Sequence, residues 1–136
     1  VVLWNTVTGE SSRIKHLSIG PVIQTAFSPD GRELYCGSFY KFGTWPLQGA
    51  DTELSWFPKS EGAFIFSPDG KKLAWESMER DGYEADKVRL FVADMETGEK
   101  KDYSAGFDQN VAGINWSGDG KSVYFISDIH FTIKAT

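Results

Sequence analysis

The fold is decided by a ten-residue stretch in the middle of the chain, Phe66-Ser67-Pro68-Asp69-Gly70-Lys71-Lys72-Leu73-Ala74-Trp75. Apolar and aromatic residues stand on both sides of a polar centre, which is typical of two strands joined by a tight turn. Pro68 presets φ for the first central turn position, the Asp69 carboxylate can cap the turn, and Gly70 supplies a positive φ. The stretch therefore predicts an antiparallel hairpin.

The same pattern occurs twice more, as Phe27-Ser28-Pro29-Asp30-Gly31-Arg32-Glu33-Leu34-Tyr35 and, with glycine in place of proline, as Trp116-Ser117-Gly118-Asp119-Gly120-Lys121-Ser122-Val123-Tyr124. Three copies in 136 residues indicate a repeat protein. Ser67 follows Ser28 by 39 residues, and Ser117 follows Ser67 by 50. The extra 11 residues are about the length of a polar stretch at 79–87, which we interpret as an insertion.

The repeat unit predicts the fold class. Each unit holds four short strands in a period of about 40 residues, which is typical of a β-propeller blade. A second set of turn glycines, Gly9, Gly49 and Gly98, precedes the next repeat serine by 19, 18 and 19 residues. No segment has a helical period over ten residues. We predict an all-β fold, a partial β-propeller with about two complete four-stranded antiparallel blades plus half-blades at each end.

The register of the repeats divides the chain into blades. We predict a fragment of one propeller domain over 1–136, with the end of a blade at 1–20, a blade at 21–60, a blade at 61–105 containing the insertion 79–87, and the start of a blade at 106–136. Three aromatic residues should occupy equivalent places near the ends of the innermost strands, namely Phe27, Phe66 and Trp116. A closed propeller needs at least four blades, so we expect a piece of a larger propeller whose exposed blade edges self-associate.

Composition excludes several classes of function. The net charge of −5 disfavours nucleic acid as a partner, because phosphate contacts need clustered basic residues. No apolar run is long enough to span a membrane. The single cysteine, Cys36, excludes a disulfide within the chain and a cysteine-based metal site, and its apolar surroundings predict a buried structural thiol.

Few residues are candidates for chemistry. The two histidines, His16 and His130, stand alone without metal-ligand spacing. An acidic cluster surrounds the insertion but lacks the oxygen spacing of a calcium loop, and it comprises Glu76, Glu79, Asp81, Glu84 and Asp86. Because Arg80 and Lys87 are interspersed, we interpret the cluster as a solvated, self-paired surface, with capture of a peptide amino terminus as the alternative. We expect no metal or cofactor site.

Two other features carry expectations about packing and contacts. The tryptophans recur in the strand pattern, which favours packing between blades over ligand stacking, and they are Trp4, Trp45, Trp56, Trp75 and Trp116. The insertion 79–87 lies between strands expected to be neighbours in one blade, so it should project from the rim as a hairpin or loop. Its Tyr83, flanked by Glu84 and Asp86, is the expected contact for another domain or a peptide.

These repeats resemble a known family. Phe66–Trp75 is similar to the WD-like propeller repeat of the TolB family and of prolyl oligopeptidase-family serine peptidases. The third unit, Arg80–Lys87 followed by Arg89–Val92 and Asp94–Gly98, is similar to propellers of bacterial dipeptidyl and acylaminoacyl peptidases, as is Phe107–Val111. The resemblance covers roughly residues 21–127.

The resemblance implies a function outside this sequence. In that family the propeller restricts peptide access to a separate α/β-hydrolase domain, which carries the catalytic residues, and the compartment is periplasmic or extracellular. No Gly-x-Ser-x-Gly elbow occurs here, since Tyr40 stands where the closing glycine would follow Ser38. We therefore expect no catalytic residue in this chain, with the hydrolase domain and a peptide substrate as its partners. A TolB-like protein-binding propeller and a structural module of a sensor are the alternatives.

Overall fold

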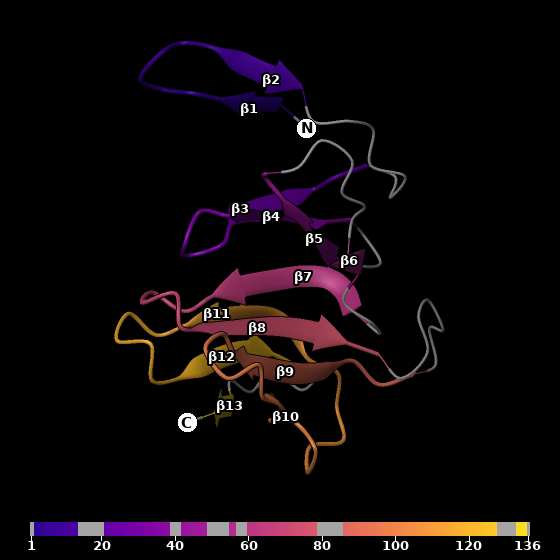
Figure 1. The fold of residues 1–136 in the computed structure, drawn as a ribbon. Coiled ribbons are helices and arrows are strands. Elements are labelled where there is room, and N and C mark those ends of the chain that lie inside the picture. Colours follow the sequence, from indigo (N-terminus) through magenta and orange to yellow (C-terminus); the bar gives the residue numbers. More distant parts are fainter. Residues whose placement is uncertain are drawn as a thin grey trace.

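The computed structural model describes residues 2–13, 21–38, 42–48, 55–56, 60–78, 86–127 and 133–135. These residues form four successive antiparallel sheets, each packed against the next, with the N-terminal hairpin at one end of the molecule (Figure 1). The sheets hold two, four, four and three strands in chain order, and we call them blades I to IV. The predicted all-β, partial-propeller fold is confirmed.

Each blade is a meander in which consecutive strands are neighbours. Blade I comprises β1 (Val2–Trp4) and β2 (Ser11–Arg13). Blade II comprises β3 (Gln24–Phe27), β4 (Glu33–Gly37), β5 (Phe42–Pro46) and β6 (Ser55–Trp56). Blade III comprises β7 (Ser60–Phe66), β8 (Lys72–Ser77), β9 (Arg89–Asp94) and β10 (Lys100–Asp102). Blade IV comprises β11 (Ala112–Trp116), β12 (Val123–Ile126) and β13 (Ile133–Ala135).

The three repeat turns have one geometry. In each, the serine hydroxyl donates to an aspartate Oδ1 at 2.6 Å, and these pairs are Ser28–Asp30, Ser67–Asp69 and Ser117–Asp119. The same serine oxygen accepts the backbone N–H of the residue five positions on, and the aspartate oxygen accepts the N–H two positions on. The glycine that follows has φ near +70° in every copy. The replacement of proline by Gly118 therefore leaves the turn intact.

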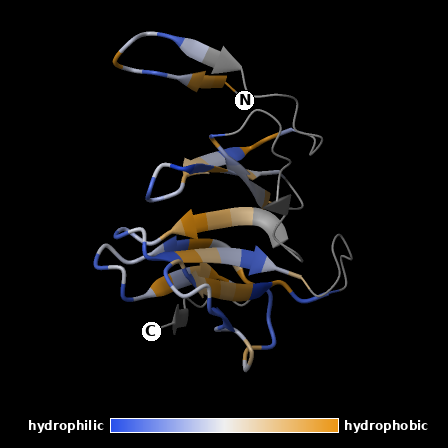
Figure 2. Ribbon diagram, in the orientation of Figure 1, coloured by the Kyte–Doolittle hydropathy of each residue, from blue (hydrophilic) through white to orange (hydrophobic). Residues whose placement is uncertain are grey.

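The turns fix the register of the hairpins. Phe27 pairs with Leu34, Phe66 with Leu73, and Trp116 with Val123, each at the last position of the first strand of its blade. The predicted equivalence of these aromatic residues is confirmed. Figure 2 shows how polarity follows the hairpins: most hydrophobic residues lie along the strands, and most of the connecting turns are hydrophilic.

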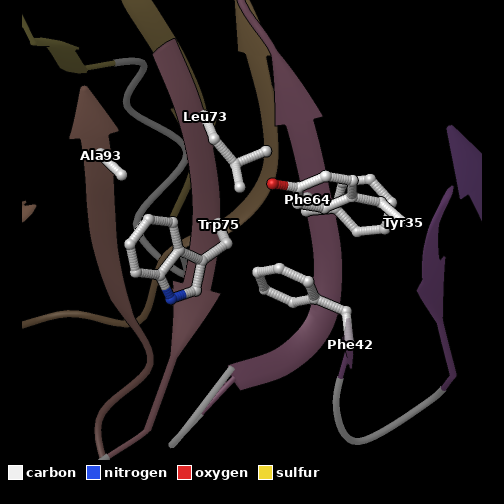
Figure 3. Close-up of a cluster of buried hydrophobic side chains, with 6 residues drawn as sticks. All are labelled: Tyr35, Phe42, Phe64, Leu73, Trp75 and Ala93. Atoms are coloured by element: carbon white, nitrogen blue, oxygen red, sulfur yellow. The ribbon is translucent and has the colours of Figure 1, made fainter. Parts of the chain in front are cut away.

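The core lies between blades. Tyr35 and Phe42 of blade II meet Phe64, Leu73 and Trp75 of blade III, with the Phe42 and Phe64 rings 5.0 Å apart (Figure 3). Side chains alternate along a strand, so Ala74, which stands between Leu73 and Trp75 in β8, points to the opposite face of blade III. On that face a second cluster packs blade III against Val111, Val123 and Phe125, at and just before blade IV. Each aromatic pair adds roughly 0.5–1.5 kcal/mol beyond the area it buries.

The tryptophan prediction is correct in part. Trp75 is buried in the interface between blades II and III, and the Trp116 Nε1–H of blade IV donates to the Ile65 carbonyl of blade III at 3.1 Å. Trp45 packs against a small cluster in blade II. Trp4 contradicts the prediction with 66% of its surface exposed, because Leu3 is the residue of β1 that turns toward blade II. The side chain of Trp56 lies outside the described residues.

Pro46 is the final residue of β5, and the next amide, Leu47 N–H, donates to the Arg32 carbonyl, so a proline is accommodated at this strand end.

Blades II and IV each expose apolar side chains. Phe27 in blade II and Ile126 in blade IV have more than half of their surface exposed, and Tyr124 beside Ile126 is also exposed. Tyr124 and Ile126 alternate along β12 with the buried Val123 and Phe125, so they lie on the face of blade IV that points away from blade III.

A close contact between turns predicts a position-specific effect of alanine. A Cβ on Gly70 would lie 2.8 Å from Cβ and Cγ of Pro29 in the neighbouring blade, whereas a Cβ on Gly31 would meet nothing within 4 Å. Both glycines have a positive φ, so either alanine costs about 1–2 kcal/mol in backbone strain. We expect Gly70→Ala to cost about 1–3 kcal/mol more than Gly31→Ala in urea unfolding, because only Gly70→Ala also overpacks the blade contact. Equal losses would contradict the inferred role of this contact.

Candidate functional site

The candidate site lies at the end of the strands where the insertion joins β8 to β9. These two strands are direct neighbours, paired from Lys72–Asp94 to Ser77–Arg89, as the insertion prediction requires. Of the three predicted contact residues, Asp86 is half-buried just before β9, whereas Tyr83 and Glu84 lie outside the described residues. The prediction of a projecting loop also falls on residues outside the described part.

Asp86 lines a pocket of about 380 Å³. The other lining residues come from the segment just before β9, the start of β9, the end of β10 and the loop after it, and they are Lys87, Arg89, Asp102 and Ala105. The lining thus contains two carboxylates and two cations. Arg89 Nη1 lies 3.8 Å from Asp102 Oδ2, and the Arg89 guanidinium also stacks 5.2 Å from the centre of the Phe91 ring. A pocket with balanced charges suits a dipolar or zwitterionic group better than a bare ion.

Lys87 ties the end of the insertion to the loop between blades III and IV. Its Nζ donates to the backbone carbonyl of Phe107 and, at 3.5 Å, to that of Ser104. The next residue, Val88, donates its N–H to Asn110 Oδ1 at 2.9 Å and accepts the N–H of Val111 at 3.0 Å. The residues between the insertion and β9 are therefore anchored by the segment that leads from blade III to blade IV.

Ser104 is the buried centre of this anchor, with 1% of its surface exposed. Its Oγ accepts the Leu90 N–H and donates to Asp102 Oδ1, both at 2.9 Å, and its own N–H donates to the same Asp102 oxygen at 2.8 Å. Since Asp102 also faces Arg89, one carboxylate links the buried serine to the charged pocket. The pocket wall is thereby held by bonds to backbone.

Sequence reasoning did not find this anchor. Asp102 ends the outer strand β10 and Ser104 follows shortly after it, so both look like ordinary strand-end residues, and their partners on β9, Arg89 and Leu90, are distant in sequence. The stretch Phe107–Val111 did carry a resemblance, and the structure gives it a physical role through Asn110 and the Phe107 carbonyl. A local pattern cannot predict such pairing because it joins β9 to residues of the next strand and of the loop that follows.

Of the remaining acidic candidates, Glu76 makes a contact that supports the fold. Glu76 Oε1 accepts the N–H of Gly113, a residue of blade IV with positive φ, so it bridges two blades. Glu79 and Asp81 lie outside the described residues. Within the part of the chain that the structure describes, no group of acidic, histidine or cysteine side chains is arranged to hold a metal ion.

The nucleophile candidates are also constrained by the fold. Cys36 is fully buried in β4, and burial raises the pKa of its thiol, which confirms the expected structural cysteine. Ser38 is 4% exposed. Both histidines, His16 and His130, lie outside the described residues, so no serine–histidine pair can be placed.

Among the described residues, no helix is long and apolar enough to cross a membrane.

The four antiparallel sheets define the chain as part of a β-propeller. The tricorn protease, a β-propeller protein, superimposes on 93% of the chain with a TM-score of 0.64 and 16% identity, covering 13% of that structure. This likeness establishes the fold. No family model matches the chain.

Curated relatives narrow the comparison. A dipeptidyl-peptidase 5 of Porphyromonas gingivalis is 56% identical over 60% of this chain and 10% of its own length. A dipeptidyl-peptidase 5 of Porphyromonas endodontalis is 39% identical over 49% of the chain and 12% of its length, and one of Arthroderma benhamiae is 30% identical over 52% and 10%. The chain thus spans about a tenth of the relatives it matches, and it is similar to a segment of these peptidases.

The Ser104 anchor predicts a loss of stability on truncation. Ser104→Ala leaves the buried Leu90 N–H without its acceptor and should lower the free energy of unfolding by about 1–3 kcal/mol. Ser11→Ala, at an exposed strand position, serves as the control and should change it by less than about 0.5 kcal/mol. Urea unfolding followed by tryptophan fluorescence measures both, and an unchanged midpoint for Ser104→Ala would contradict the anchor.

Proposed function

We propose that the chain is the non-catalytic propeller portion of a prolyl oligopeptidase-family serine peptidase of the dipeptidyl peptidase type. The observation that carries the proposal is the 56% identity to a dipeptidyl-peptidase 5, on a chain that folds as consecutive propeller blades. The four sheets then belong to one propeller domain, and a separate α/β-hydrolase domain supplies the nucleophile, its base and the acid. The WD-like character of the repeats is part of this proposal.

The role of the propeller is to limit and orient peptides on their way to the hydrolase domain. The charged pocket around Asp86, Arg89 and Asp102 supports this role, because it lies at the base of the insertion and is held rigidly by Ser104 and Lys87. A peptide terminus or a loop of the hydrolase domain carries the dipolar chemistry that such a pocket accommodates. Tyr83 and Glu84 would extend the same contact.

A second candidate function is a TolB-like propeller that docks proteins without catalysis. The observation that supports it is the repeat stretch Phe66–Trp75, which resembles the repeats of both classes and forms the same turn in each of its three copies. The two proposals differ in what the complete gene product contains and does. In either case, we propose that the 136-residue chain alone self-associates through Phe27, Tyr124 and Ile126, because these apolar side chains are exposed on blade faces.

The experiment is an activity assay of the full-length gene product with dipeptidyl 4-nitroanilides. We expect serine-peptidase turnover by the full-length protein and none by the 136-residue chain. Replacing residues 80–86 by Asn-Gly in the full-length protein should lower kcat/KM by about tenfold, because substrate or domain positioning is lost, and should leave folding nearly intact. Asp108→Asn, an exposed charge change on the neighbouring loop and outside the pocket, is the control.

The outcomes separate the candidates. A full-length protein without a Gly-x-Ser-x-Gly elbow and without turnover would overturn the peptidase proposal and favour the binding module. Turnover that is unaffected by the deletion would keep the peptidase and remove the insertion from its mechanism. Turnover by the 136-residue chain alone would contradict the assignment of catalysis to another domain.

A further inference from the structure

A second concave site lies at the opposite end of the strands from the insertion. The turns β3–β4, β7–β8 and β9–β10 all project at that end (Figure 1). Between them is an open groove of about 360 Å³, which is within the size range of small-ligand pockets. Residues of all three turns line it, with Pro29, Gly70 and Met95 among them.

The floor of the groove is apolar and built by packing. The Pro29 ring lies directly against Gly70 of the next blade, at a distance that leaves no space for a side chain on that glycine. Met95 packs against the aromatic core between blades II and III, and its N–H donates to the Lys71 carbonyl at 2.8 Å. The three turns are thereby held in a fixed relation, with a hydrophobic surface exposed between them.

The rim of the groove is strongly acidic. Four lining residues carry carboxylates, Asp30, Glu33, Asp69 and Glu96, and only Lys71 carries a positive charge. The Ser28 hydroxyl lowers the pKa of Asp30 and the Ser67 hydroxyl lowers that of Asp69, with backbone N–H bonds adding to both effects. These two carboxylates are therefore ionised throughout the neutral range.

The arrangement of floor and rim restricts the occupant. A small metal ion is disfavoured, since among the described residues no three acidic side chains are grouped to hold one. A neutral apolar ligand would leave the excess of negative charge on the rim uncompensated. An aliphatic stem that ends in a spread-out cation matches both features, because its methylene groups cover the floor while its charged head reaches the rim.

We propose that this groove binds an arginine side chain presented by an extended polypeptide. The guanidinium offers five N–H donors in a plane, enough to reach carboxylates on separate turns, which a compact ammonium cannot do as well. The stem lies over Pro29 and Met95, and the head faces Asp30, Asp69 and Glu96. This inference does not rest on the peptidase proposal, because it uses the other end of the blades and residues of three turns alone.

The test is an NMR titration of the ¹⁵N-labelled 136-residue chain with acetyl-Gly-Arg-Gly-amide. We expect shifts of the backbone amides of Asp30, Lys71 and Glu96, weakening as salt is added. The matched probe is acetyl-Gly-citrulline-Gly-amide, which keeps the shape and removes the charge, and it should bind markedly more weakly.

Variants locate the binding. The double variant Glu33→Gln/Glu96→Gln removes two rim charges at exposed or half-exposed positions and should weaken the arginine peptide by about fivefold. The double variant Glu10→Gln/Glu99→Gln makes the same change of charge outside the groove and is the control, with Glu99 in the same turn as Glu96. Equal binding of the citrulline peptide, equal weakening by the control variant, or shifts confined to other residues would each overturn the proposal.

Discussion

The structure depends on one short hydrogen bond that is made three times, from a serine hydroxyl to the aspartate two residues on. The hydroxyl oxygen also accepts an N–H from the far side of the turn, so the serine closes the hairpin through one atom that both donates and accepts. Ser28 and Ser67 are buried although their aspartates are exposed. The bond therefore connects the water-facing turn to the first layer of the core, and it fixes which aromatic residue ends each inner strand.

The same turn determines how blades meet. With the hairpin closed, the proline of one turn is placed over the glycine of the next, as for Pro29 on Gly70 and Pro68 on Gly120. In blade IV the proline is replaced by Gly118, yet the Ser117–Asp119 bond and the positive φ of Gly120 are kept. The serine and aspartate thus build the turn, whereas the proline serves the contact between blades. Bonds across the interfaces reinforce this stacking, including Gln24 Nε2 to the Phe64 carbonyl and Glu76 Oε1 to the Gly113 N–H.

The sequence predicted the features that repeat locally and missed those that join separate strands or separate blades. The hairpins, their register and the burial of Cys36 follow from patterns within ten residues, since turn chemistry and alternation act at that range. The anchor at Ser104 and the groove over Pro29 and Met95 join residues from different strands or different blades, so no single stretch of sequence predicts them. The prediction that Trp4 packs between blades was wrong, because a three-residue strand has too little alternation to distinguish its buried face from its exposed face. For the contact predicted at the insertion, Asp86 is the residue whose surroundings are described.

The most direct test of the repeated turn is amide hydrogen exchange measured by NMR at Glu33, Lys72 and Ser122. Each of these amides donates to the serine oxygen of its own turn at 2.9–3.0 Å. If the serine–aspartate pair closes all three hairpins in the same way, the three amides exchange slowly and with similar protection, the third despite its missing proline. Exchange of any one of them at the rate of an unfolded chain would contradict the account.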